Sequence, residues 1–212
     1  MENNELDNFI KDFCGIDGIR ALVLGGSRTT ERFDEKSDYD FYVYSENGID
    51  QEIRHKILTR YCKYFEIGNK YWELEDNGQL ICGIDFDLVY RNLQQFENTV
   101  ADGVEKNNSY NGFTTCLWDN ILNSKIIFDK NDVFKKMKER FTIPYPQKLK
   151  ENIVKRNMAL LSGSVVSYDK QIIKSIHRKD LINLNNRISV FLASYFDIIF
   201  AINELPNPEQ NV

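Results

Sequence analysis

The 212-residue sequence predicts an α+β fold, in which a mixed β-sheet with flanking helices is followed by a C-terminal helical part. Before residue 144, short apolar or aromatic runs alternate with segments whose apolar residues have helical spacing. A Pro-Tyr-Pro break occupies residues 144–146, and the pattern after it is helical. We therefore expect two domains, residues 1–143 and residues 147–205.

The first elements follow from apolar spacing. Residues 6–13 have apolar side chains three or four positions apart, which predicts a helix. The apolar run 20–24 predicts a buried strand, closed by two glycines. A helix is expected over residues 27–33, with a serine at its N-terminal end. The aromatic run 41–44 predicts a second strand, and residues 50–61 have helical spacing again.

Three extended segments are expected next, at residues 64–67, 71–74 and 80–90. The dipeptides Gly68-Asn69 and Asn77-Gly78 are turn signals between them. Further helices are expected at residues 92–106, 114–122, 133–140, 148–166 and 181–203, with a short strand at 126–128. Trp72 and Trp118 are expected in the core.

The chain has a net charge of −5, but its basic residues are unevenly distributed. The segment from Lys148 to Asp180 contains eight Lys or Arg residues and three acidic residues, a local excess of +5. This segment could form a basic wall opposite an acidic metal site, and a solvated helix face is the alternative. The overall acidity argues against a nucleic-acid partner and favours a small acceptor.

Neither a membrane nor a secretory location is expected. The N-terminus is acidic and has no apolar core, unlike a signal peptide, and no apolar run is long enough to span a bilayer. The four cysteines, at positions 14, 62, 82 and 116, form no close pair. We expect them to be reduced thiols of a cytoplasmic protein, without a zinc site.

The strongest chemical signal is the pair Asp38 and Asp40. Residues i and i+2 of a strand point to the same face, so both carboxylates should project together. Two close carboxylates repel each other unless a cation lies between them, and Mg²⁺ prefers hard oxygen ligands. An acidic pair alone is weak evidence, because such pairs also occur on solvated strands.

The run of Gly25, Gly26 and Ser27 strengthens this interpretation. Glycines allow close approach of the backbone, and free amides at a helix N-terminus bind anions. The turn could therefore hold a triphosphate, although a tight strand-to-helix connection needs no ligand. Arg28 could add positive charge for a phosphate.

A third carboxylate is expected from the strand that contains Asp85 and Asp87, which should share one face. If this strand lies beside that of Asp40, one of the two completes a metal-binding cluster. We favour Asp87, because it precedes an apolar run as Asp40 does, and Asp85 is the alternative.

Residues 22–27 (Leu-Val-Leu-Gly-Gly-Ser), followed ten residues later by residues 38–43 (Asp-Tyr-Asp-Phe-Tyr-Val), resemble the signature of the polymerase-beta-type nucleotidyltransferase superfamily. Its small members include aminoglycoside and lincosamide nucleotidyltransferases and minimal nucleotidyltransferase antitoxins. Ser37 also matches the pattern, and the resemblance covers residues 19–90. A weaker likeness over residues 114–204 is to an uncharacterised bacterial group whose members continue further, so we expect this chain to be short at its C-terminus.

The resemblance implies transfer of a nucleoside monophosphate from a nucleoside triphosphate, most simply ATP, to a hydroxyl of a small antibiotic-like molecule or a protein. The implied catalytic and metal-binding residues are Asp38, Asp40 and Asp87, which would hold two magnesium ions. The implied nucleotide-binding residues are Gly25, Gly26, Ser27, Arg28 and Ser37.

The sequence is also compatible with other functions. One is an antitoxin-like or regulatory nucleotide-binding module that acts on a partner protein. Another is a glycosyltransferase that uses the acidic pair, although this leaves the glycine turn unexplained. An RNA-tailing enzyme and a non-catalytic relative are further alternatives. The apolar face of the last helix also suggests a homodimer.

Overall fold

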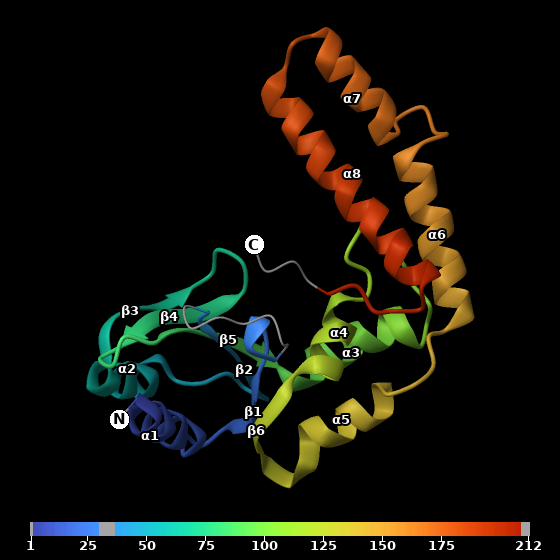
Figure 1. Cartoon of the computed structure of the whole chain (residues 1–212). Coiled ribbons are helices and arrows are strands. Elements are labelled where there is room, and N and C mark those ends of the chain that lie inside the picture. Colours follow the sequence, from blue (N-terminus) through green and yellow to red (C-terminus); the bar gives the residue numbers. More distant parts are fainter. Residues whose placement is uncertain (1, 30–36, 209–212) are drawn as a thin grey trace. The chain divides into compact units, whose positions relative to one another are not determined.

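The computed structural model describes residues 2–29 and 37–208 (Figure 1). Contacts within the described residues group the chain into two compact units. The N-terminal unit runs to Glu97 and also includes Asn123–Arg140, whereas the C-terminal unit consists of Asn98–Leu122 and the chain from Phe141 onward. The two domains expected at residues 1–143 and 147–205 stay a prediction, and the contacts place residues 98–122 with the C-terminal helices.

The N-terminal unit is built on a six-stranded sheet of the described residues, in the order β3-β4-β5-β2-β1-β6. The strands are β1 (Ile19–Leu24), β2 (Tyr39–Ser45), β3 (Cys62–Asn69), β4 (Leu74–Leu80), β5 (Asp85–Asn92) and β6 (Lys125–Asp129). Only the neighbours β2 and β5 are parallel; the other pairs in this described sheet are antiparallel. The predicted α+β class with a mixed sheet is confirmed.

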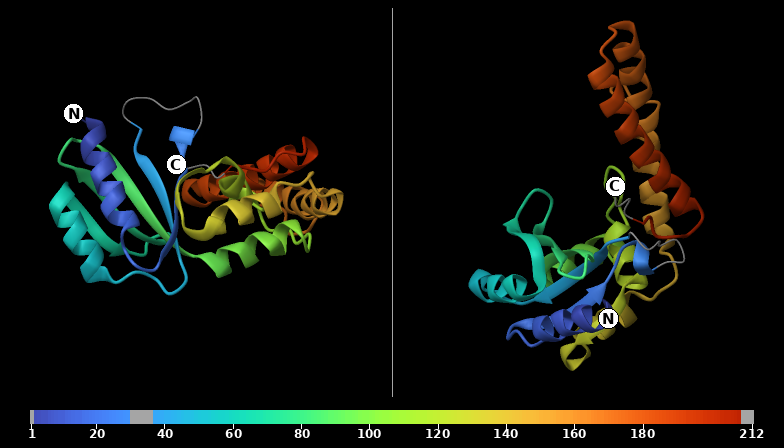
Figure 2. Two further views of the ribbon diagram at one scale, coloured as in Figure 1. Left: turned by 90° about the horizontal axis from the view of Figure 1, so that it is seen from below. Right: turned by 60° about the vertical axis from the view of Figure 1, so that its left-hand side comes forward.

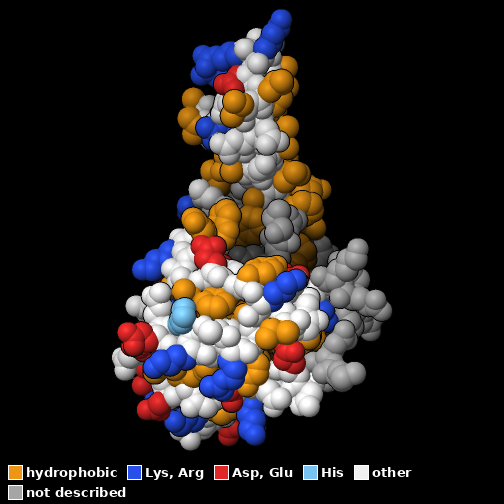
Figure 3. Space-filling model, turned by 90° about the vertical axis from the view of Figure 1, so that its left-hand side faces the viewer, with side chains coloured by type: hydrophobic (Ala, Val, Ile, Leu, Met, Phe, Trp, Pro, Cys, Tyr) orange, Lys and Arg blue, Asp and Glu red, His pale blue; other side chains and the backbone are white. Residues whose placement is uncertain are grey.

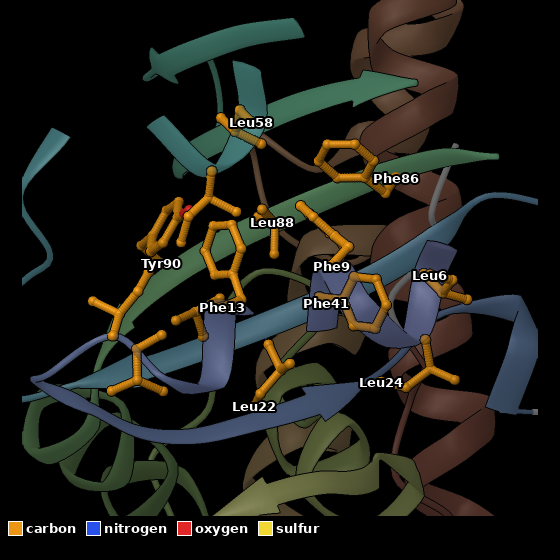
Figure 4. Close-up of a cluster of buried hydrophobic side chains, with 14 of the residues drawn as sticks. Leu6, Phe9, Phe13, Leu22, Leu24, Phe41, Leu58, Phe86, Leu88 and Tyr90 are labelled. Carbon is orange, nitrogen blue, oxygen red and sulfur yellow. The ribbon is translucent and has the colours of Figure 1, made fainter. Parts of the chain in front are cut away.

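Helices α1 (Glu2–Cys14) and α2 (Gln51–Tyr61) cover one face of this sheet (Figure 2). Figure 4 shows Phe9 and Phe13 of α1 lying against aromatic and aliphatic side chains of the strands. Phe41 of β2 and Leu88 of β5 belong to this buried cluster. Because side chains alternate along a strand, Asp40 and Asp87 project from the opposite face.

Part of the opposite face is covered by residues from α3 (Leu93–Val104) and α5 (Val133–Phe141). The ring of Tyr44 packs against Phe96 and Phe134, with centroids 5.1 and 5.2 Å away. This aromatic cluster lies near the carboxyl end of β2, whereas the acidic residues lie at its start. The carboxyl end of β2 therefore contributes to the packed core, whereas its start carries the acidic side chain of Asp40.

Two predictions in this unit, one of a turn and one of a strand, were wrong. Asn77-Gly78 does not form a turn but lies inside β4, where a Cβ on Gly78 would come within 2.7 Å of the Tyr64 carbonyl oxygen. Glycine is needed there for close strand approach. The chain turns instead before β5, at Gly83, which has a φ of +93°. The expected strand at 71–74 begins only at Leu74.

The helix expected at 27–33 is a short 3₁₀ turn at Ser27–Thr29, and residues 30–36 lie outside the described part. Trp118 is buried as expected, but Trp72 is 89% exposed in the connection between β3 and β4. A hairpin connection has no second layer to cover a side chain, which explains this difference.

The C-terminal unit contains α4 (Cys116–Asn123), α6 (Gln147–Leu161), α7 (Tyr168–His177) and α8 (Leu181–Ile202). Both α6 and α7 pack along α8. The single helix expected at 148–166 was wrong, because α6 ends at Leu161 and Gly163 then adopts a φ of +95°. Helix α7 was not predicted.

One face of α8 stays exposed in the described structure, and Figure 3 shows hydrophobic side chains along these C-terminal helices. It carries Leu181, Ile188, Leu192, Tyr195, Ile199 and Ile202. A homodimer through this face stays a prediction. None of the described helices is both long and apolar enough to cross a membrane, and all four cysteines are free thiols.

A buried ion pair joins α2 to the strands. Asp76 of β4 is fully buried, and its carboxylate accepts hydrogen bonds from Arg54 Nη1 (2.5 Å), the Gly68 amide (2.7 Å) and the Tyr90 hydroxyl (2.7 Å). The Arg54 guanidinium also lies 4.5 Å from the Tyr90 ring centroid. All these donors compensate the cost of burying the carboxylate.

We expect Asp76→Ala to lower the free energy of unfolding by about 3–5 kcal/mol, because it leaves the Arg54 guanidinium buried without its counter-charge. Urea unfolding followed by circular dichroism measures this. Asp7→Ala, an exposed change on α1, serves as the control and should cost under about 0.5 kcal/mol. Equal effects of the two changes would contradict the assigned role of the pair.

Candidate metal and nucleotide site

Three carboxylates meet at the start of the parallel pair β2 and β5. Asp40 and Asp87 are direct neighbours in the register, and Asp38 immediately precedes β2. Each offers an oxygen atom that lies within 4.8 Å of the others. Asp38 is exposed, whereas the other two are half-buried. Asp85, the alternative third carboxylate, lies outside this group and accepts a hydrogen bond from Gln79 Nε2 (3.0 Å).

The pKa values record the cost of this arrangement. The pKa of Asp40 is raised to about 6, first by burial and then by the charges of Asp38 and Asp87. Burial also raises the pKa of Asp87, against the opposing effect of a hydrogen bond from Asn77. Asp40 and Asp87 therefore resist ionisation, because both are partly buried and lie beside other carboxylates.

The glycine turn lies directly against this cluster. The Gly25 amide donates to the Asp40 carbonyl oxygen (2.8 Å), which joins the end of β1 to the start of β2. A Cβ on Gly26 would come within 1.6 Å of Asp40 Oδ2, and Gly26 also has a φ of +60°. Only glycine satisfies both conditions. Ser27 is exposed at the start of the following 3₁₀ turn.

Arg28 braces the chain that leads into β2. Its Nε donates to the carbonyl oxygens of Ser37 (2.8 Å) and Asp38 (2.9 Å). Its guanidinium lies 3.9 Å from the ring centroid of Tyr39. These contacts hold the backbone that leads to Asp38, and the nucleotide-binding roles expected for Arg28 and Ser37 stay predictions.

Asn77 is a site residue that the sequence reasoning missed, because it was assigned to a turn. It pairs with Asp87 in the β4–β5 register, and its Nδ2 donates to Asp87 Oδ1 (2.5 Å). Asn69 of β3 donates in turn to Asn77 Oδ1. This chain of amides fixes the orientation of Asp87. An i+2 alternation through Glu75, Asn77 and Gln79 is the sequence signal that could have revealed it.

The cluster fits a divalent metal ion. Its ligands are carboxylate oxygens, which Mg²⁺ prefers, and their mutual repulsion would be relieved by a cation. The Gly26 amide and the Ser27 hydroxyl of the adjoining turn are donors suited to phosphate oxygens. The arrangement can therefore hold a metal ion next to a phosphate-bearing ligand.

Comparison with known proteins agrees with this chemistry. Residues 6–110 match the family model of the nucleotidyltransferase domain. No curated protein matches the chain. The predicted membership of a nucleotidyltransferase superfamily is confirmed by the family match.

Two solved structures are similar at low identity. One is a nucleotidyltransferase-like protein from Exiguobacterium sibiricum 255-15, with 9% identity and a TM-score of 0.42. That match covers 96% of this chain and 58% of the other, so this chain spans just over half the length of that structure. The other is a toxin-antitoxin structure with AMP-PNP, with 12% identity, a TM-score of 0.36, and coverage of 76% of this chain and 96% of that one.

We expect Gly26→Ala to abolish the rise in melting temperature that Mn²⁺ or Mg²⁺ causes, because the new methyl group displaces the Asp40 carboxylate. Gly48→Ala is the matched control: Gly48 has a φ of +74°, but nothing lies within 4 Å of the position that a Cβ would take there. Both changes should cost about 1–2 kcal/mol of backbone strain. Retention of the metal response in Gly26→Ala would contradict the contact with Asp40.

The raised pKa of Asp40 predicts a pH-dependent penalty in the metal-free protein. A carboxyl with a folded pKa of about 6 binds its proton more tightly than in the unfolded chain, where about 3.9 is usual. Its favourable contribution is therefore present below about pH 4 and is lost as the pH rises through 6. Melting curves in EDTA should show Asp40→Asn gaining stability relative to wild type between pH 4 and 7. Parallel pH profiles of the two proteins would refute this.

Proposed function

Residues 6–110 of this chain form a nucleotidyltransferase domain, and we propose that the protein uses it to transfer a nucleoside monophosphate from a nucleoside triphosphate to an acceptor hydroxyl. The observation that carries this proposal is the meeting of Asp38, Asp40 and Asp87 with the glycine turn. A glycosyltransferase would need an acidic pair as well, but it would not explain why Gly26 is built against Asp40.

In this proposal, Asp38, Asp40 and Asp87 hold magnesium, with two ions in the loaded enzyme. Bound magnesium would neutralise triphosphate charge and stabilise the attacking and leaving oxygens. The Gly26 amide and the Ser27 hydroxyl bind the β- and γ-phosphates. Arg28 acts indirectly, since its hydrogen bonds to the backbone of Ser37 and Asp38 keep the first carboxylate in position.

The reaction is a displacement at the α-phosphorus. The acceptor oxygen forms a bond to that phosphorus, the bond to the bridging oxygen breaks, and pyrophosphate leaves. Asp87 accepts the acceptor's hydroxyl proton, a role favoured by its raised pKa and by the orientation that Asn77 imposes. Positioning and charge neutralisation provide most of the rate enhancement.

ATP is the first triphosphate to test, and the acceptor is a small molecule or a protein. The net charge of −5 argues against a long nucleic-acid acceptor, whose phosphates would be repelled. We further propose a cytoplasmic location in a bacterium, where free thiols such as the four cysteines stay reduced.

Calorimetric titration of ATP, GTP, CTP and UTP, with and without magnesium, tests the proposal. We expect magnesium-dependent binding of at least one triphosphate to wild type and its loss in Asp38→Ala, because a ligand of the metal is removed. Turnover should fall at least about a hundredfold. Failure of every triphosphate to bind wild type would refute the function.

Ser27→Ala is the graded control in the same titration. It removes one neutral hydrogen bond, so affinity should fall by only about three- to tenfold. Affinity equal to that of wild type would remove Ser27 from the phosphate site and leave the turn with a purely structural role.

A further inference from the structure

A second ligand site is suggested by a cavity of about 580 Å³ that is wide open to solvent on the surface of the C-terminal unit. This volume falls in the range of small-molecule sites. The cavity shares no residue with the carboxylate cluster. It is lined by Ser109, Asn111, Asn152, Lys155, Arg156, Ala159, Leu160 and Ser164.

The charge of this cavity is positive and uncompensated. Lys155 and Arg156 of α6 both line it, and neither forms an ion pair with a carboxylate of the described chain. Arg156 Nε donates to Asn111 Oδ1 (2.8 Å), which holds the guanidinium at the wall. No acidic residue lines the cavity among the described residues. The side chains of Lys155 and Arg156 are exposed to solvent, and two such cations that line one cavity without a carboxylate of the described residues beside them favour an anion.

The neutral part of the wall is fixed in advance by hydrogen bonds. Asn152 Nδ2 donates to the Asn107 backbone carbonyl oxygen (2.8 Å). The backbone carbonyl oxygen of Asn152 accepts a hydrogen bond from Ser109 Oγ (3.2 Å). Asn157, which is fully buried behind this wall, donates to the Tyr110 carbonyl oxygen (3.2 Å) and accepts from the Gly112 amide (3.2 Å). The loop between α3 and α4, residues 105–115, is thus hydrogen-bonded to α6 at several points.

A buried carboxylate strengthens this anchoring. Asp197 of α8 is 1% exposed and accepts hydrogen bonds from the amide and hydroxyl of Thr114 (3.1 and 2.7 Å). It also accepts from Asn157 Nδ2 (3.2 Å). The loop keeps Asn107 and Phe113 at φ values of 62° and 53°, which non-glycine residues rarely adopt. Such a conformation persists only where surrounding contacts enforce it.

We propose that this cavity binds a small organic phosphate. A phosphate monoester carries a charge of about −1.5 to −2 at neutral pH, which matches the charges of Lys155 and Arg156. The Arg156 fork suits phosphate oxygens, and Lys155 adds a point charge. Ser109, Asn152 and Ser164 hydrogen-bond the hydroxyl groups of the organic part, which packs on Ala159 and Leu160. Because hydrogen bonds already hold Arg156, Asn152 and Ser109, binding loses little conformational entropy at these three residues.

Calorimetry on the full chain in EDTA tests this, with ribose 5-phosphate as the probe and ribose as its uncharged counterpart. The absence of metal removes any reason for an anion to bind the acidic cluster. We expect saturable binding of ribose 5-phosphate at one site and none of ribose. Arg156→Gln and Lys155→Gln should each weaken binding about tenfold or more, because each removes a charge-assisted hydrogen bond.

Lys148→Gln is the matched control, since Lys148 is exposed on the same helix but does not line the cavity. Its affinity should equal that of wild type. Circular dichroism verifies that each variant is folded. The proposal is overturned if wild type does not bind ribose 5-phosphate, if ribose binds equally well, or if Lys148→Gln weakens binding as much as the cavity variants.

Discussion

Electrostatic repulsion among three carboxylates is the constraint around which the N-terminal unit is organised. Asp38, Asp40 and Asp87 present oxygens within 4.8 Å of one another, and the pKa of Asp40 is raised first by burial and then by the charges of Asp38 and Asp87. The fold supplies the stability to hold them there. The buried pair of Arg54 and Asp76 and the aromatic core under α1 and α2 fasten the strands that carry the cluster.

The backbone around the cluster is shaped by the same requirement. The Asp40 carboxylate occupies the space that a side chain at Gly26 would take. Arg28 donates hydrogen bonds to the backbone carbonyl groups that precede β2. Asn77 plays the corresponding part for Asp87. Gly26 and Arg28, which the sequence suggests as nucleotide-binding residues, thus also fix the position of the carboxylates that would bind the metal ion. Such fixed geometry is what transfer chemistry requires, because the rate depends on positioning.

The two units use charge in opposite ways. The N-terminal unit gathers negative charge at the start of β2 and β5, which suits a cation and its phosphate ligand. The C-terminal unit leaves Lys155 and Arg156 without a counter-charge beside a loop that Asn157 and Asp197 hold in place. The sequence showed this asymmetry only as an excess of basic residues from Lys148 onward. The structure shows that two of them, Lys155 and Arg156, line the same cavity.

The sequence by itself determined the fold class, most strands and the candidate carboxylates Asp38, Asp40 and either Asp85 or Asp87, because alternation and the Gly-Gly-Ser spacing are local properties. Tertiary structure decided what local patterns cannot express. The β4–β5 register places Asn77 opposite Asp87, and Asp85 lies outside the cluster. Gly78, which the sequence predicts in a turn, lies in β4, where β3 approaches too closely for a side chain. The break after Leu161 and the exposure of Trp72 likewise depend on which surfaces other elements cover. Pairing and coverage join residues distant in the chain, so no short pattern encodes them.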